Sequence, residues 1–174
     1  MGLKAYSAAI PQFTTVLVTV NVYCPGHGGG GCISSGTPIY TPGGVSRIQD
    51  LTLGQTVYGY NVSTHSLVSE HVSGLNSTSA TALLGINWGQ LNLTFTDQPI
   101  WIANSTGTHW LTDPENLSVG DLLYDPQSGT WIPVVNLTGV SGTATVYDLS
   151  VTGPTKDFVA GLVVVGIKPH EGSV

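Results

Sequence analysis

Hydrophobic and polar residues alternate in several stretches of the chain, and this alternation predicts β-strands. Near the N-terminus, Val16, Val18, Val20 and Val22 occupy every second position, which is the spacing of side chains on one face of a strand. Further β-rich segments cover residues 55–61, 90–96, 99–103, 130–135, 144–151 and 158–167. No stretch has a clear apolar stripe at the 3.6-residue period of a helix. We therefore predict an all-β fold.

The 23 glycines and 10 prolines are spread along the chain, most of them between these segments, as expected for many short strands joined by tight turns. The segment from Cys24 to Cys32 differs, because five of its nine residues are glycine, a composition typical of a flexible connector. It divides an N-terminal arm at residues 1–31, which contains the valine strand, from a body at 32–168 and a tail at 169–174. The prediction is a compact β domain preceded by a β-strand arm.

Charge is sparse along the chain. Four Lys and Arg stand against ten Asp and Glu, a formal net charge of −6, which would repel a phosphate backbone, so nucleic acid is not an expected partner. Charged residues make up 8% of the chain against about 25% in a typical soluble domain, so solubility must come from uncharged polar groups or from groups attached to them. The longest apolar run, at 158–167, is shorter than the roughly 20 residues of a membrane helix. We predict no membrane span and no cofactor.

Three ordered blocks of the body carry a family resemblance. They are, in chain order, CISSGTPIY (32–40) with IQDLTLGQTV (48–57), FTDQP (95–99) with LSVGDLL (117–123), and VYDLSV (146–151) with KDFVAGLVVV (156–165). Together they resemble the Hint family, the self-processing domain shared by inteins and hedgehog proteins. The resemblance covers nearly the whole body and implies a Hint-like β domain.

The resemblance also implies a chemistry for particular positions. In the family, a cysteine at the start of the domain attacks the peptide bond before it, and this position is Cys32. A Thr and a His three residues later act on the same amide, and here they are Phe95 and Gln98. Glutamine forms hydrogen bonds but does not take up or release a proton near neutral pH. The family's C-terminal His-Asn, which cyclises to release the downstream segment, aligns with Gly166 and Ile167, and neither can do this chemistry.

Substitutes for some of these groups stand nearby in the sequence. Thr94 or Thr96 is a replacement source of a hydroxyl, Asp157 is a candidate relic of the family's assisting group in the final block, and His109 is the candidate replacement base. With four departures from the family pattern, we interpret the body as a Hint-like scaffold kept for another purpose. The prediction is that the protein is not an enzyme.

The chain has two cysteines, Cys24 and Cys32, and three states remain open for them. A disulfide would close a nine-residue loop whose glycines make the geometry easy to reach, and it would remove the nucleophile. The alternatives are a free, unused thiol and an active nucleophile at Cys32. A zinc site that adds His27 fits no strong zinc-binding pattern, so we expect no metal.

Asparagines are placed unusually for so small a chain. Two interpretations stay open, a coat of N-linked glycans and a polar β-protein that uses Asn and Thr in its turns. Both place the protein outside the cytoplasm more easily than inside, in an extracellular, cell-surface or virion-surface location. Six of the eight asparagines stand in Asn-x-Ser/Thr frames, namely Asn61, Asn76, Asn92, Asn104, Asn116 and Asn136.

Three functions compete. The first is a self-assembling structural subunit, in which the valine strand is donated to a sheet edge of a neighbouring copy. Head-to-tail repetition of this contact would build a filament. The alternative is that the strand folds back onto its own body. The second is an active self-processing domain, in which Cys32 attacks the Gly31 carbonyl and releases residues 1–31 as a thioester. The third is a carbohydrate or protein adhesin that does not polymerise. We favour the first, with copies of itself and possible N-linked glycans as partners.

An adhesin would be marked by aromatic and carboxylate side chains gathered on one loop face. The sequence spacing locates no such patch. Trp88, Trp101, Trp110 and Trp131 are expected to be core and rim anchors of the β domain rather than a platform on which a ligand stacks.

Overall fold

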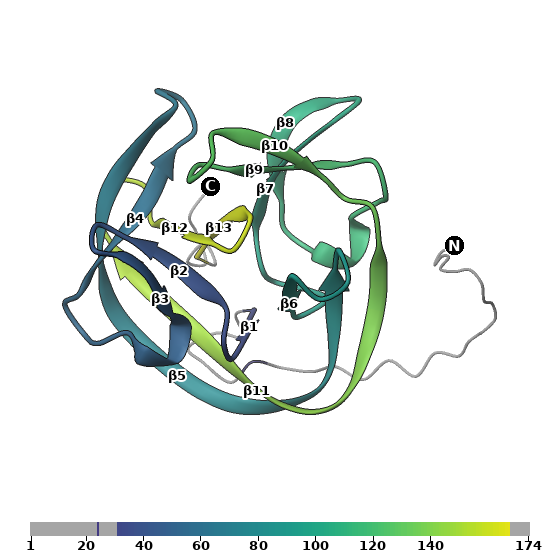
Figure 1. Ribbon diagram of the computed structural model, residues 1–174, viewed down its shortest axis with the longest axis horizontal. Coiled ribbons are helices and arrows are strands. Elements are labelled where there is room, and N and C mark those ends of the chain that lie inside the picture. Colours follow the sequence, from purple (N-terminus) through teal and green to yellow (C-terminus); the bar gives the residue numbers. More distant parts are fainter. Residues whose placement is uncertain (1–23, 25–30, 168–174) are drawn as a thin grey trace.

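The computed structural model describes Cys24 and residues 31–167 (Figure 1). The fold is all-β, as the alternation of residues predicts, and its only helical elements in these residues are two short 3-10 turns, η2 (Ile48–Asp50) and η3 (Pro114–Asn116). The strands are β1 (Ile33–Ser34), β2 (Pro38–Thr41), β3 (Gly44–Arg47), β4 (Thr56–Asn61), β5 (Ser66–Ile86), β6 (Leu91–Leu93), β7 (Ile100–Asn104), β8 (Gly107–Leu111), β9 (Leu122–Asp125), β10 (Thr130–Pro133), β11 (Leu137–Thr152), β12 (Asp157–Ala160) and β13 (Val163–Gly166). Within this part of the chain, no helix is long and apolar enough to cross a bilayer.

Two long strands organise the first sheet. β5 and β11 pair antiparallel from Leu137 opposite Ile86 to Thr152 opposite His71, with two register shifts on the way. Such irregularities bend a ladder and increase its twist, and the pair curves along the lower edge of the view in Figure 1. The short β1 pairs with β11 and β6, and β6 pairs with β5. β1 is therefore held on the inner side of the curve.

The second sheet has the order β10-β9-β7-β13-β12-β2-β3, with β8 paired to β7. Its central strands β12 and β13 are buried along their whole length, and Phe158 is among the largest fully buried side chains. The core lies between the two sheets. It takes side chains from both of them, including Ile33, Val57, Leu93, Ile100, Ile102, Leu149, Phe158 and Val165.

The predicted strand at 158–167 is wrong as a single element. Gly161, at φ +58°, turns the chain so that β12 and β13 form a hairpin, with Asp157 opposite Gly166. Both halves are apolar because both are buried, so hydrophobicity alone does not reveal the turn. The valine strand at Val16–Val22 lies outside the described residues.

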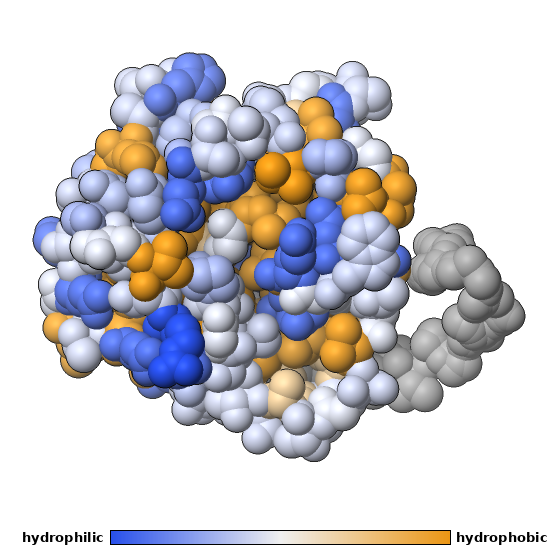
Figure 2. Space-filling model, in the orientation of Figure 1, coloured by the Kyte–Doolittle hydropathy of each residue, from blue (hydrophilic) through white to orange (hydrophobic). Residues whose placement is uncertain are grey.

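Apolar residues also reach the surface. On the face in Figure 2 they are visible in its hollowed centre and in scattered patches amid a mostly polar surface. The most exposed large ones are Trp88 and Leu53, at 75% and 71%. Scattered exposed apolar residues are normal for a soluble domain and by themselves mark no interface.

Candidate functional site

Cys32 lies in the interior, immediately before β1, and is fully buried. Its backbone N–H donates to Thr94 Oγ1 at 3.0 Å, and its carbonyl accepts from the Thr94 N–H at 3.0 Å. The N–H of Cys32 is the amide of the Gly31–Cys32 peptide bond. A buried hydroxyl therefore contacts the nitrogen of the bond that the family resemblance singles out.

Gly31, on the other side of this bond, is held against the segment that carries Gln98. Its N–H donates to the Asp97 carbonyl at 2.8 Å, and Asp97 is itself fixed by an N–H bond to Asp113 Oδ1 at 2.9 Å. A Cβ placed on Gly31 would lie 2.8 Å from Gln98 Cα and would collide with Gln98 Cβ. Only glycine fits here without movement of the neighbouring backbone.

Gln98 links this junction to the end of the domain. Its side chain is almost fully buried, and Nε2 donates to the Gly166 carbonyl at 3.0 Å. Gly166 in turn donates its N–H to the Pro99 carbonyl at 2.9 Å, and Ile167 donates to the Lys156 carbonyl at 3.2 Å. The first and last blocks of the resemblance are thus brought together around one buried amide.

Phe95 takes no part in the hydrogen bonds of this site. Its side chain packs, partly buried, against the core, and the hydroxyl beside Cys32 comes from Thr94, which also donates to the Thr96 carbonyl at 3.2 Å. Of the two replacement hydroxyls expected from the sequence, Thr94 is the one in place. The hydroxyl at the Cys32 amide thus comes from one residue before the position that the family resemblance assigns to it.

The sulfur of Cys32 is paired with that of Cys24 in a disulfide, with the two Cα atoms 5.6 Å apart. Both cysteines are buried in a small cluster with Ala80, Leu83 and Val146. The disulfide expected from the spacing is present, so in this structure Cys32 carries no free thiol. Among the residues that the structure describes, no group of three or more His, Cys, Asp or Glu side chains is placed to hold a metal ion.

Asp157 does not join the junction through its hydrogen bonds. It is buried on β12, and Oδ1 accepts from the Tyr60 N–H and from Thr155 Oγ1, each at 2.8 Å. The same Thr155 hydroxyl lies 3.4 Å from Oε2 of Glu70, which is fully buried. Glu70 also accepts from the backbone N–H of Lys156 at 2.8 Å. The sequence does not reveal this carboxylate pair, because Glu70 stands alone in a segment with no recognised motif.

The environment of Asp157 disfavours its charge. Its pKa is raised from 3.8 to about 6, mainly by burial and in smaller part by the negative charge of Glu70, against the opposing hydrogen bonds of Tyr60 and Thr155. A Cβ on Gly59 would lie 2.6 Å from Asp157 Oδ1, so this strand passes close enough to keep water away. The carboxylate pair, with Glu70 on β5 and Asp157 on β12, therefore makes the stability of the fold sensitive to pH.

His109 is not placed as a replacement base. It lies on β8 opposite Ile102. The next residue, Trp110, packs beside Gly166, and two of its ring atoms would lie 3.2 and 3.5 Å from a Cβ built on Gly166. Successive side chains of a strand point to opposite faces. His109 therefore faces away from the junction.

Two of the six asparagine frames have local roles in turns, and a third makes a long-range contact. Asn61 Oδ1 accepts the backbone N–H of Ser63, and Asn104 Oδ1 accepts that of Thr106. Asn136 Oδ1 accepts the backbone N–H of Trp88, which is distant in the sequence. The first two bonds fit the interpretation of asparagine as a turn residue, and all three leave the amide nitrogens for other use. Asn92 differs, since its carbonyl oxygen is buried. Glycosylation at the six sites stays a prediction.

Comparison with known proteins bears on the fold alone. No protein-family model and no curated protein matches the sequence. Among solved structures, a bacterial intein-like domain from Clostridium thermocellum superposes with a TM-score of 0.65 at 23% identity, over 78% of this chain and 97% of that one. The fold is that of a Hint, or intein-like, domain. Two inteins have the same fold. The TvoVMA intein superposes with a TM-score of 0.64 at 20% identity, over 78% of this chain and 97% of that one. A DnaB intein from Synechocystis sp. PCC 6803 superposes with a TM-score of 0.60 at 24% identity, over 79% of this chain and 99% of that one.

The close approach at Gly31 makes a prediction for the Hint-like domain. Gly31→Ala should lower the free energy of unfolding by about 1–3 kcal/mol, the usual cost of forcing an extra group into a packed site. Gly139→Ala is the matched control, because a Cβ there meets no atom within 4 Å. Urea unfolding followed by tryptophan fluorescence measures both. Equal stability of the two variants would contradict the assigned contact.

The raised pKa of Asp157 predicts a pH dependence. Because its pKa of about 6 in the fold exceeds its ordinary 3.8, the folded protein binds this proton more tightly than the unfolded chain. The contribution to stability is complete below about pH 4 and is lost as the pH rises through about 6. The loss is of the order of 3 kcal/mol by pH 8.

Asp157→Asn should remove this contribution, because the amide carries no charge at any of these pH values. Urea unfolding between about pH 4 and pH 8 should give variant and parent curves that diverge with rising pH, the variant gaining in relative stability. The control is Asp50→Asn, at a side chain that is 50% exposed and pairs with Arg47. A constant difference between Asp157→Asn and the parent across this range would contradict the assignment.

Proposed function

We propose that this protein is a structural subunit of a cell or virion surface, built on a Hint-like domain that no longer processes its own chain. The observation that carries the proposal is the chemistry of the junction. The nucleophilic step needs a free thiolate, and the sulfur of Cys32 is bonded to Cys24 instead.

The step after the attack, release of the Cys32 nitrogen, would fail as well. Release of the Cys32 nitrogen as an amine requires a proton donor. Gln98 offers an amide that stays neutral and donates its hydrogen bond to the Gly166 carbonyl. Gly166 and Ile167 have no side-chain amide that could cyclise and release the downstream segment. The fold thus keeps the shape of the junction, while the sulfur that would attack the peptide bond is held in a disulfide and the groups that would transfer protons are replaced.

A domain that does not cleave the Gly31–Cys32 bond keeps the arm, residues 1–31, attached. The disulfide ties the arm to the interior of the body at Cys24. Strand donation needs an acceptor edge, and the second sheet ends in the short edge strands β3 and β10. Val45 on β3 is 52% exposed. A disulfide is also typical of an oxidising compartment, which favours an extracellular or surface location.

The alternative is self-processing under reducing conditions. It draws on the Thr94 hydroxyl at the Cys32 amide and on the glycine before Cys32. Reduction would free the thiol, and a cleaved chain would then lose residues 1–31.

Intact-mass spectrometry distinguishes a structural subunit that keeps its whole chain from a self-processing domain. We expect the full-length chain before and after dithiothreitol, with a gain of two hydrogens on reduction and no fragment that begins at Cys32, even after prolonged incubation with thiol. Thr94→Val is the companion variant, and its mass should behave in the same way. Thiol-dependent loss of residues 1–31, slowed by Thr94→Val, would overturn the proposal in favour of self-processing.

Assembly is tested on the arm itself. Purified protein should form filaments visible by negative-stain electron microscopy, and Val20→Asp should raise the concentration needed for assembly at least about tenfold by placing a charge in the donated strand. Val119→Asp is the matched control, since Val119 is 63% exposed on the body. Filaments that form equally well with Val20→Asp, or no filaments from the parent protein, would contradict donation of this strand.

A further inference from the structure

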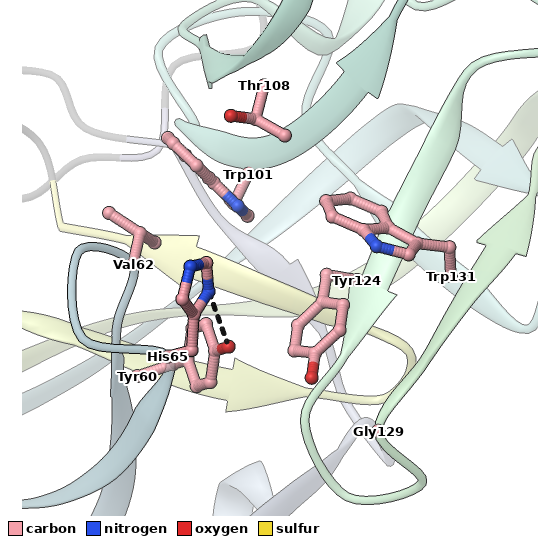
Figure 3. Close-up of a pocket in the computed structure, with 8 residues that line it drawn as sticks. All are labelled: Tyr60, Val62, His65, Trp101, Thr108, Tyr124, Gly129 and Trp131. Carbon is pink, nitrogen blue, oxygen red and sulfur yellow. Dashed lines mark hydrogen bonds between the residues drawn. The ribbon is translucent and has the colours of Figure 1, made fainter.

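A cavity of about 350 Å³ opens between three hairpins of the body (Figure 3). Tyr60 and His65 come from the β4–β5 hairpin, Trp101 and Thr108 from β7–β8, and Tyr124 and Trp131 from β9–β10. Figure 3 shows Tyr60 and His65 on one side and Tyr124 and Trp131 on the other, with Trp101 and Thr108 across the space between them. The volume lies at the lower end of the range of about 300–1,000 Å³ that is usual for small-molecule sites.

Aromatic rings form the walls of this pocket. The ring centroids of Tyr60 and Tyr124 are 5.0 Å apart and those of Tyr124 and Trp131 are 4.9 Å apart, both pairs tilted. Trp131 is paired directly with Tyr124 across β9 and β10, and Trp101 with Trp110 across β7 and β8. Cross-strand pairs of this kind hold their rings in place before any ligand arrives. Trp131 is nevertheless 37% exposed, so a ligand can reach its ring.

Polar groups stand between the rings. The Tyr60 hydroxyl lies 3.5 Å from His65 Nδ1, and Thr108 adds a second hydroxyl to the lining. Burial is the main cause that raises the pKa of Tyr60 to about 12, with the hydrogen bond and charge of Tyr124 adding to it, so this hydroxyl remains protonated at physiological pH. No Lys, Arg, Asp or Glu is among the described residues that line the cavity.

We infer that this pocket binds an uncharged sugar ring. A pyranose presents C–H groups on one face, which pack on aromatic rings, and hydroxyls at its edge, which pair with hydroxyl, imidazole and indole N–H groups. A purely apolar ligand would leave those polar groups unpaired, at a cost in binding. An anion would find no Lys or Arg in the described lining, and a small cation would find no carboxylate there. The lining chemistry therefore favours a neutral, hydroxyl-rich ligand.

Two sources of such a ring are compatible with the position of the pocket. Asn61 stands between the lining residues Tyr60 and Val62, and Asn104 ends β7 in the hairpin that carries Trp101 and Thr108. Both are in glycosylation frames, so one source is a glycan attached near the pocket, on this chain or on a neighbouring copy. The other source is a glycan on a foreign surface. The chemistry at the rings is the same in both cases.

The test uses methyl α-mannopyranoside and N,N′-diacetylchitobiose as probes, with saturation-transfer NMR and tryptophan fluorescence as readouts. We expect the protein to bind at least one of the two sugars with a Kd of the order of 1 mM. Trp131→Ala should weaken binding about tenfold or more. Trp131→Phe should weaken binding less, because it keeps an aromatic face. This second variant also covers the case in which the alanine variant folds poorly. Trp88→Ala is the matched control, because Trp88 is 75% exposed on the β5–β6 turn and outside the pocket. It should bind like the parent.

Enzymatic removal of any N-glycans before titration distinguishes the sources. Binding that appears only after removal indicates that the protein's own glycan fills the pocket, and equal binding before and after indicates a foreign glycan. The inference is overturned if neither sugar binds with a Kd below about 10 mM, if Trp131→Ala binds as well as Trp88→Ala, or if tetramethylammonium chloride binds at the same rings in place of both sugars. The outcome does not depend on the fate of the arm or of the Gly31–Cys32 bond.

Discussion

The antiparallel ladder between β5 and β11 is the interaction on which the rest of the body depends. It joins residues far apart in the sequence, from Leu137 with Ile86 to Thr152 with His71, and its register shifts let it curve around the core. The inner side of this curve accepts β1 through β11 and β6. Cys32 precedes β1 directly, so the ladder fixes the junction in the interior, where its amide finds a hydrogen bond to Thr94.

Burial of the junction changes what each substituted group can do. A peptide bond in the interior must have its polar atoms paired, and the contacts of Gly31, Cys32 and Gln98 meet this need. An amide at Gln98 satisfies the Gly166 carbonyl as well as a histidine would, without a titratable group. The disulfide to Cys24 completes the change. The hydrogen bonds of the junction therefore pair its buried polar atoms in the intact chain.

The sequence predicts those features whose signal is local. Alternation locates β4, β7 and β10 closely, and the ordered blocks of the resemblance lead to the meeting of Cys32, Gln98 and Gly166. The strand β5 escapes notice because its central residues, around Asn76 to Ser79, are polar and largely exposed. Partner strands, not side-chain pattern, hold this stretch extended.

Features that depend on tertiary contact have no local signal. Glu70 and Asp157 meet because β4 passes between their strands, a contact that requires a glycine at Gly59. The aromatic pocket is divided among three hairpins, so Trp101 and Trp131 look like separate anchors in the sequence. The expectation that the tryptophans are core and rim anchors does not fit Trp88, which is 75% exposed, and it misses the way in which the other rings gather.

The junction and the aromatic pocket are physically connected through Trp110. Its ring lies against Gly166, where the family resemblance places a histidine, and ring atoms come within 3.2 Å of a Cβ position there. The same ring packs edge-on against Trp101 of the pocket at a centroid distance of 5.3 Å. A side chain at Gly166 would require the Trp110 ring to shift by a few tenths of an ångström, and this ring supports Trp101 of the pocket. The end of the domain and the aromatic pocket are therefore packed against the two sides of one tryptophan.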